Sequence, residues 1–214
     1  MDGHLLRFNK KARYCFVDVE TFNLCLNMEY NRPWQYGIVE LVGEEVVNRE
    51  EILVKWPESD TVKCSDDAAR INHYNEYTVS TKGISPIEAW RILDEMFKKA
   101  DYIVGHNILG FDTYLIRDHY NQCVKDWHFI MPKILDTRAL ILGIKTGYKY
   151  KQGDDLLRYQ YQLINTPHKG VKTSLSALLK EYEIDFDPER LHDAVYDIEK
   201  NAELWNKMKY EIEI

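Results

Sequence analysis

Two carboxylates lie two positions apart in an apolar stretch near the start of the chain. Asp18 and Glu20 belong to YCFVDVETF, residues 14–22, which otherwise has the composition of a buried strand. Side chains alternate across a strand, so Asp18 and Glu20 share one face while Val17 and Val19 point to the other. Neighbouring carboxylates repel unless a cation or a shared proton lies between them. The pair therefore predicts a cation site, or else a solvated strand end whose acids pair with Lys or Arg.

Two more acids follow other predicted elements. Asp112 ends GHNILGFD and begins a predicted helix directly after an apolar strand, where an acid can also simply complement the helix dipole. Asp197 lies three residues after Ala194, on the side of the last predicted helix that carries its apolar stripe, and a carboxylate there needs a partner. His192 lies about 140° from Asp197 around an ideal helix, so we expect it at the helix entrance, after Pro188.

Together, four carboxylates from one strand and two helices form an oxygen-rich set of potential ligands. Such sets select hard cations, Mg²⁺ or Mn²⁺. Two of these ions, about 4 Å apart, activate water and stabilise the leaving oxygen in an in-line phosphoryl displacement. An unperturbed histidine titrates near pH ~6.5 and can accept a proton from that water. The residues therefore predict hydrolysis of a phosphodiester.

The elements that must position these residues can be read from hydrophobic periodicity and capping signals. A meander of strands comes first and is followed by alternating helices and strands, which indicates an α/β fold with a mixed sheet covered by helices. We expect strands at 14–19, 33–42, 46–54, 101–106 and the start of 133–143, and helices at 85–100, 111–121, the end of 133–143, 174–184 and 192–209.

Composition limits the class of protein. The chain has 214 residues, 45% of them apolar, and we expect a single domain over 1–214. No apolar run has the length of a membrane span, the N-terminus lacks a signal-peptide core, and the four cysteines form no CxxC pair, so we expect a soluble cytoplasmic protein with reduced thiols. The net charge of −7 argues against non-specific nucleic-acid binding over the whole surface.

Residues 143–173 fit neither the helix period nor the strand period, and the segment is too long for an ordinary connection. Cations, among them Lys149 and Lys151, alternate there with tyrosines. Cations and stackable rings suit a single-stranded nucleic acid. The alternative is a solvated hairpin whose tyrosines pack locally.

The three acidic motifs, in this order, resemble those of the DEDDh 3′–5′ exonucleases, the family that includes the proofreading epsilon subunit of DNA polymerase III, ribonuclease T and oligoribonuclease. DVET, GHNILGFD and HDAVYD, with the His-x-Ala-x-x-Asp spacing, carry the resemblance, which spans about residues 14–205. It implies a ribonuclease H-like fold with a mixed five-stranded sheet flanked by helices. The segment near 143–173 departs from the family pattern and resembles an insertion in this single domain. The resemblance also implies that Asp18, Glu20, Asp112 and Asp197 bind two divalent cations, Mg²⁺ or Mn²⁺, that His192 is the general base, and that nucleoside 5′-monophosphates leave from a 3′ end.

The resemblance further suggests substrate contacts. Asn107 and Phe111 would shape the pocket for the terminal nucleotide. Thr21 could fix the turn after the first strand, and Phe22 would stack on the terminal base or simply pack. We expect nucleic acid with a free 3′ end as substrate, DNA ahead of RNA, and no membrane. A polymerase-binding tail is not evident, and a homodimer is possible. The competing hypotheses are a catalytically silent nucleic-acid or protein-binding module and a metal-dependent phosphatase or nucleotide hydrolase.

Overall fold

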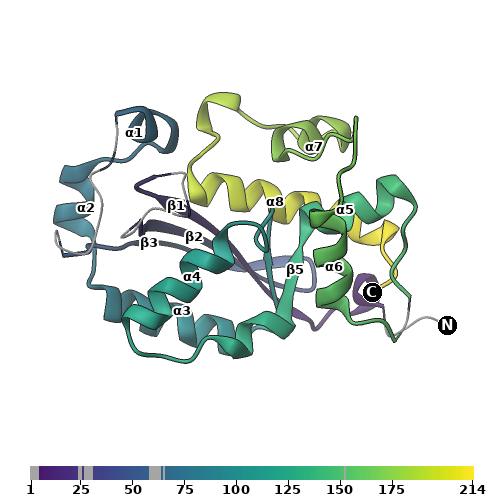
Figure 1. Cartoon of the computed structure of the whole chain (residues 1–214), viewed down its shortest axis with the longest axis horizontal. Helices are drawn as coiled ribbons and strands as arrows, with labels where there is room; N and C mark the ends of the chain where they lie inside the picture. The colour runs from purple at the N-terminus through teal and green to yellow at the C-terminus, as the bar shows by residue number, and fades with distance from the viewer. Residues whose placement is uncertain (1–4, 24–25, 27–30, 58–63, 65, 152) are drawn as a thin grey trace.

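The computed structural model describes residues 5–23, 26, 31–57, 64, 66–151 and 153–214. Its centre is a mixed sheet of five strands in the order β3-β2-β1-β4-β5 (Figure 1). The strands are β1 (Arg13–Thr21), β2 (Pro33–Val42), β3 (Glu45–Leu53), β4 (Tyr102–Gly105) and β5 (Ile134–Asp136). The predicted α/β class and the predicted strands are confirmed, with ends that differ by a few residues.

The direction of the strands decides where the acids lie. β1, β2 and β3 form an antiparallel meander, whereas β4 runs parallel to β1, and β5 runs parallel to β4. The carboxyl ends of β1, β4 and β5 therefore meet at one edge of the sheet, the edge at which α/β proteins bind ligands. The pairing of β1 with β4 ends at Phe16 and Val104. Asp18 and Glu20 consequently lie on the part of β1 that runs past the end of β4.

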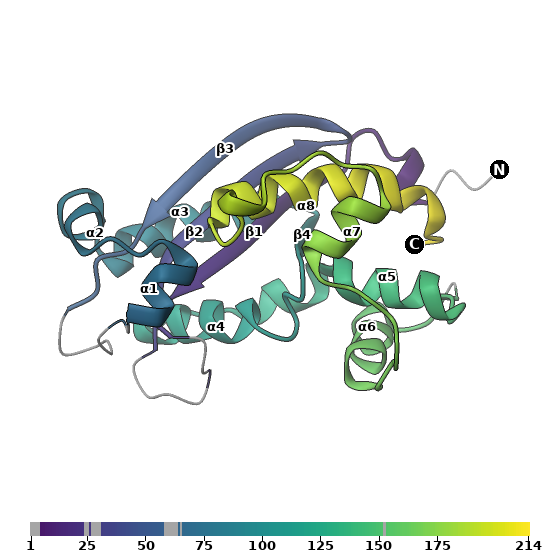
Figure 2. The ribbon, with the colours of Figure 1, turned by 90° about the horizontal axis from the view of Figure 1, so that it is seen from above.

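Helices cover both faces of the sheet (Figure 2). On one face, α3 (Pro86–Lys99) and α4 (Asp112–Gln122) pack against Cys15, Val17 and Val19. On the other face, the cluster around Tyr14 and Phe16 includes side chains of α5 (Thr137–Thr146), α7 (Leu175–Glu181) and α8 (Ala194–Met208). The alternation predicted for β1 is therefore confirmed: Val17 and Val19 serve one core, and Asp18 and Glu20 continue the opposite face.

Two capping signals work as the sequence predicts. Ser85 caps α3 through a capping box, since its Oγ accepts from the backbone N–H of Glu88 while its own N–H donates to the Glu88 carboxylate at 3.1 Å. Ser174 caps α7 by accepting from the backbone N–H of Ala177. Three helices were not expected: α1 (Asp66–Asn72), α2 (Glu76–Lys82) and α6 (Leu156–Asn165).

The 143–173 segment is not a hairpin. It contains the end of α5 and all of α6, which packs on α5. Tyr159 of α6 stacks on Tyr148 and meets Tyr150 edge-on, and its hydroxyl donates to the Tyr148 carbonyl at 2.7 Å, as the local-packing alternative predicts. The helical period was hidden because Gln160 is fully buried on the apolar side, where it bonds the backbone of Ile134 and Asp136. Among the described residues, no helix is both long and apolar enough to cross a membrane.

Candidate active site

The first pair of acids lies on β1 beside a glycine. Asp18 pairs with Gly37 of β2 and Glu20 with Gln35, and both acids are half-buried. A side chain at position 37 would push α8 away from the sheet, because an added Cβ would collide with the carbonyl of Ala194 and the backbone nitrogen of Val195. Gly37 and Ala194 thus let the first turn of α8 approach the sheet next to Asp18.

Asp112 is the first residue of α4, and its side chain is 4% exposed. Burial raises the pKa of this carboxyl to about 8, although hydrogen bonds from its own backbone N–H and from that of Val19 act in the opposite direction. A carboxyl at the start of a helix, linked to the strand that bears Asp18 and Glu20, joins the second motif to the first.

The third motif forms the start of α8. His192 has a left-handed backbone with φ of 69°, and its N–H donates to Oδ2 of Asp197 at 3.1 Å. The helix begins only at Ala194, with Asp193 as its N-cap, so His192 lies before the helix as predicted. The His192 side chain is exposed, whereas Oδ1 of Asp197 is buried and has no hydrogen-bond partner.

The electrostatics show that the four acids lie near one another. Burial raises the pKa of Asp18 well above its ordinary range, and the charges of Asp112, Glu20 and Asp197 raise it further. Burial also raises the pKa of Glu20 to about 9 and that of Asp197 to about 6. The cluster therefore carries protons or requires cations at neutral pH.

Two nearby residues were not singled out in the sequence. Asp193 raises the pKa of Asp18, Glu20 and Asp197, and is thus a fifth acid at the cluster. His73, between α1 and α2, places Nε2 3.3 Å from the Leu191 carbonyl and lowers the pKa of Asp197. His73 adopts a positive φ of 56°, which no sequence pattern indicates.

A buried carboxylate organises the loop that precedes Asp112. Asp136, at the end of β5, is fully buried and accepts hydrogen bonds from the backbone N–H groups of Asn107, Leu109, Arg138 and Ala139, at 2.9 to 3.2 Å. It caps α5 and holds the β4–α4 loop at the same time. The sequence signal was an acid at a strand end directly before a helix, which is a common N-cap position.

The residues predicted to contact substrate differ in how near they lie to the acids and in how exposed they are. Asn107 and the half-buried Phe111 lie on the β4–α4 loop, next to Asp112. Thr21 is buried and donates to the Asn23 carbonyl at 2.6 Å, as expected of a turn-fixing residue. Phe22 is 5% exposed and meets the ring of Tyr74 edge-on, a packing role.

Lys149 and Lys151 are not brought to the acids. Lys149 lines a hollow with residues 211–213, which follow α8 at the end opposite Asp197. Helix α8 rises about 16 Å between Asp197 and its last residue, Met208, which precedes that hollow. Figure 1 shows the end of α5 on the same side of the molecule as the C-terminus, away from the start of α8.

The donor set fits hard divalent cations in its chemistry. All four side chains are carboxylates, the charges of the other three raise the pKa of Asp18, and one buried oxygen of Asp197 has no partner. In the part of the chain that the structure describes, no three His, Cys, Asp or Glu side chains already have the geometry of a metal site.

The model of the exonuclease family of the RNase T type matches residues 15–205 of this chain. The chain belongs to this exonuclease family. The match begins within β1 and ends within α8, so it includes all three acidic motifs. A comparison with curated proteins found no match.

Solved structures give the same fold for this exonuclease-family chain. The zinc-bound E. coli exonuclease I complex with single-stranded DNA is 19% identical, with a TM-score of 0.72, over 94% of this chain and 41% of that one. The E. coli exonuclease I complex with a dA16 oligonucleotide is 18% identical, with a TM-score of 0.71, over 94% and 41% of the two chains. The complex with a dT13 oligonucleotide is 19% identical, with a TM-score of 0.71, over 94% and 42%.

The chain therefore spans about two fifths of E. coli exonuclease I, and the likeness confirms the expected ribonuclease H-like, five-stranded mixed sheet.

Proposed function

We propose that the protein is a metal-dependent 3′–5′ exonuclease that releases nucleoside 5′-monophosphates, with DNA as the preferred substrate. The observation that supports this most is the acidic cluster itself. Asp18, Glu20, Asp112 and Asp197 come from three separate elements, and the charges of Asp112 and Asp197 raise the pKa of both Asp18 and Glu20 at the carboxyl edge of the sheet. Membership of an exonuclease family supplies the reaction class.

In this proposal the four carboxylates would hold two divalent cations, which activate water and stabilise the leaving oxygen when bound. The chain's own residues supply position and proton transfer. The exposed imidazole of His192 would accept the proton of the attacking water, while its backbone N–H stays bonded to Asp197.

The substrate would enter beside the β4–α4 loop. Asn107 and Phe111 lie on the loop that leads to Asp112, so they would contact the terminal nucleotide. The structural relatives bound to single-stranded DNA, dA16 and dT13 favour a single-stranded DNA end over a paired one. Phe22 would support this site through Tyr74 rather than by stacking on a base.

The test uses oligonucleotides labelled at the 5′ end, as DNA or RNA and as single strands or duplexes. With Mg²⁺ or Mn²⁺, we expect stepwise shortening of single-stranded DNA from the 3′ end. Activity should vanish in EDTA and in Asp18→Asn. Thermal unfolding of the variant checks that it is folded.

A folded protein that shortens no substrate with either metal would refute the enzyme proposal. Metal-dependent oligonucleotide binding without any hydrolysis would instead point to the silent binding module.

A further inference from the structure

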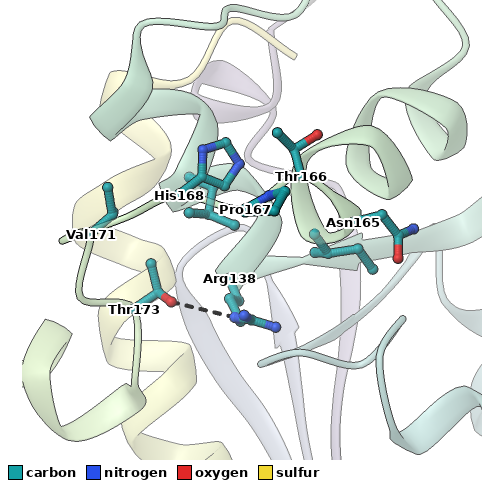
Figure 3. Close-up of a pocket in the computed structure, with 9 residues that line it drawn as sticks. Arg138, Asn165, Thr166, Pro167, His168, Val171 and Thr173 are labelled. Carbon is teal, nitrogen blue, oxygen red and sulfur yellow. Dashed lines mark hydrogen bonds between the residues drawn. The ribbon is translucent and has the colours of Figure 1, made fainter.

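A cavity of about 240 Å³ lies beside the candidate active site, between the start of α5, the end of α6 and the segment that follows (Figure 3). Figure 3 shows Arg138 and Thr173 on one side and His168 and Thr166 on the other. The remaining lining residues are Leu142, Ile164, Asn165, Pro167 and Val171. We call this cavity the Arg138 pocket. It is somewhat smaller than the roughly 300–1,000 Å³ of pockets for drug-sized ligands, and it therefore suits a single nucleotide unit.

Arg138 brings an uncompensated charge to this pocket. The side chain is half-buried; Nη1 donates to Oδ1 of Asn107 at 2.6 Å, and Nε donates to Oγ1 of Thr173 at 3.3 Å. Both partners are neutral, and in the described part of the chain Arg138 forms no ion pair. A partly desolvated guanidinium of this kind is suited to bind a phosphate.

The sequence around the pocket is basic in an acidic protein. Residues 137–180 contain eight Lys and Arg residues, of which Lys145 pairs with Glu181, but two Asp and Glu residues, whereas the whole chain has a net charge of −7. From 156 to 180 there is no acid at all. Lys169 and Lys172, on the segment that borders the pocket, are exposed. The region therefore attracts a polyanion that the rest of the surface repels.

The same hydrogen bonds hold the Arg138 pocket and the loop of the candidate active site in place. Oδ1 of Asp136 accepts from the backbone N–H of Asn107 at 3.0 Å and from that of Arg138 at 2.9 Å. The side chains of Asn107 and Arg138 bond each other as well. The loop that leads to Asp112 is thus fixed directly against the pocket wall, so a strand bound at the acids can continue into the pocket.

We propose that the Arg138 pocket binds a nucleotide of the substrate strand upstream of the 3′-terminal one, with its phosphate on Arg138 and its sugar or base in the cavity. This inference rests on the proposed exonuclease function, because it places the pocket on the same strand. It locates the contact with single-stranded nucleic acid at Arg138 and the following segment rather than at Lys149 and Lys151.

Binding in EDTA tests the pocket separately from hydrolysis. The probe is a fluorescein-labelled single-stranded DNA of about 12 nucleotides, a length within the range of single-strand binding sites. Fluorescence anisotropy is measured over a series of salt concentrations, for the wild type, Arg138→Gln and Thr166→Asp. The second variant places a negative charge at the pocket rim.

Thr146→Asp is the matched control. Thr146 and Thr166 are both exposed at helix ends, and each donates to the carbonyl four residues earlier at 2.6 Å. The two substitutions therefore remove the same bond and add the same charge in the same basic region. Thr146, however, lies eight residues along α5 from Arg138, about 12 Å away.

We expect Arg138→Gln and Thr166→Asp each to weaken binding about tenfold, and Thr146→Asp to change it less than twofold. Arg138→Gln should also reduce the slope of log affinity against log salt by about 0.7, the value for one phosphate contact on a single strand. Thermal unfolding confirms that each variant is folded.

A wild-type protein that binds no oligonucleotide, or pocket variants that bind as the wild type does, would overturn the inference. The two proposals fail in different ways. Wild-type binding that depends on Arg138, without hydrolysis under any metal condition, would leave the pocket standing and refute the exonuclease. Hydrolysis with pocket variants of unchanged affinity would do the opposite.

Discussion

The backbone N–H of His192 donates a 3.1 Å hydrogen bond to Oδ2 of Asp197, so the chain folds back on itself just before α8. The bond requires the left-handed φ of 69° at His192 and fixes one carboxylate oxygen of Asp197. The other oxygen is left buried and without a partner, next to the remaining acids. This turn of the chain therefore fixes the backbone of His192, the proposed base, and orients Asp197, a proposed metal ligand.

This relationship separates the roles of the His192 side chain and backbone. His192→Ala and His192→Gly should both lower kcat by about 10²–10⁴-fold, since each removes the proton acceptor. Glycine tolerates a positive φ, so His192→Gly should unfold at a temperature no lower than that of His192→Ala. Single-turnover kinetics and thermal melts measure the two effects. An unchanged rate in both variants would remove His192 from the mechanism.

The acidic cluster predicts a stability that depends on pH and metal. The folded-state pKa values of Asp197, Asp112 and Glu20 are raised to about 6, 8 and 9, so the folded protein holds protons that the unfolded chain releases. This contribution to stability is fully present below about pH 4, near the ordinary carboxyl pKa values, and is lost as the pH rises through the folded-state values.

We therefore expect Mg²⁺ to raise Tm relative to EDTA, by about 5 °C at pH 9 and by little at pH 5, because the cation replaces the protons. Differential scanning calorimetry over this range measures the difference. Glu20→Gln should reduce the Mg²⁺ effect at high pH. A Mg²⁺ effect that is the same at both pH values would contradict the clustered ionisation.

Gly37 predicts a link between packing and catalysis. Gly37→Ala places a Cβ against the backbone of Ala194 and Val195, which forces the first turn of α8 away from the sheet. Overpacking of this kind costs about 1–3 kcal/mol of unfolding free energy. Because that turn carries Asp197, activity should fall by more than the loss of folded protein explains. Urea denaturation and steady-state kinetics compare the two, with Val47→Ala on exposed β3 as the control.

Asp136 is expected to stabilise the fold and the loop that leads to the candidate active site. Asp136→Asn replaces one acceptor oxygen by an amide that cannot accept from the backbone N–H groups around it. We expect a loss of about 2–4 kcal/mol in unfolding free energy, since buried donors are left without partners. Chemical denaturation measures it. A loss below about 0.5 kcal/mol would show that the β4–α4 loop keeps its conformation without Asp136, since substitutions that remove no important interaction stay within that range.

Much of the molecule follows from local patterns in the sequence. The period of two in β1 separates Val17 and Val19 from Asp18 and Glu20, and the capping box at Ser85 starts α3 where the residues predict. The three ordered motifs indicated the family and the acids of the site. These features depend on neighbours within a few residues, which a sequence displays directly.

Other features depend on residues far apart in the chain, so only the tertiary structure decides them. The sequence does not predict α6, because Gln160 interrupts the apolar stripe of this helix. Its polar side chain is buried against the backbone of β5, where two hydrogen bonds satisfy it. Lys149 belongs with the C-terminal residues rather than with the acids, because α5 carries it away from the carboxyl edge of the sheet.

The sequence by itself determined which carboxylates could act together, since their spacing places each at the end of a strand or the start of a helix. The tertiary structure decided that they do lie together, through the close approach of Ala194 to Gly37. It also decided that Arg138 lies beside Asn107, because the shared bonds to Asp136 join the β4–α4 loop to the start of α5, about 30 residues away in sequence. Spacing sets which way a side chain points, but only packing and buried hydrogen bonds set what it meets.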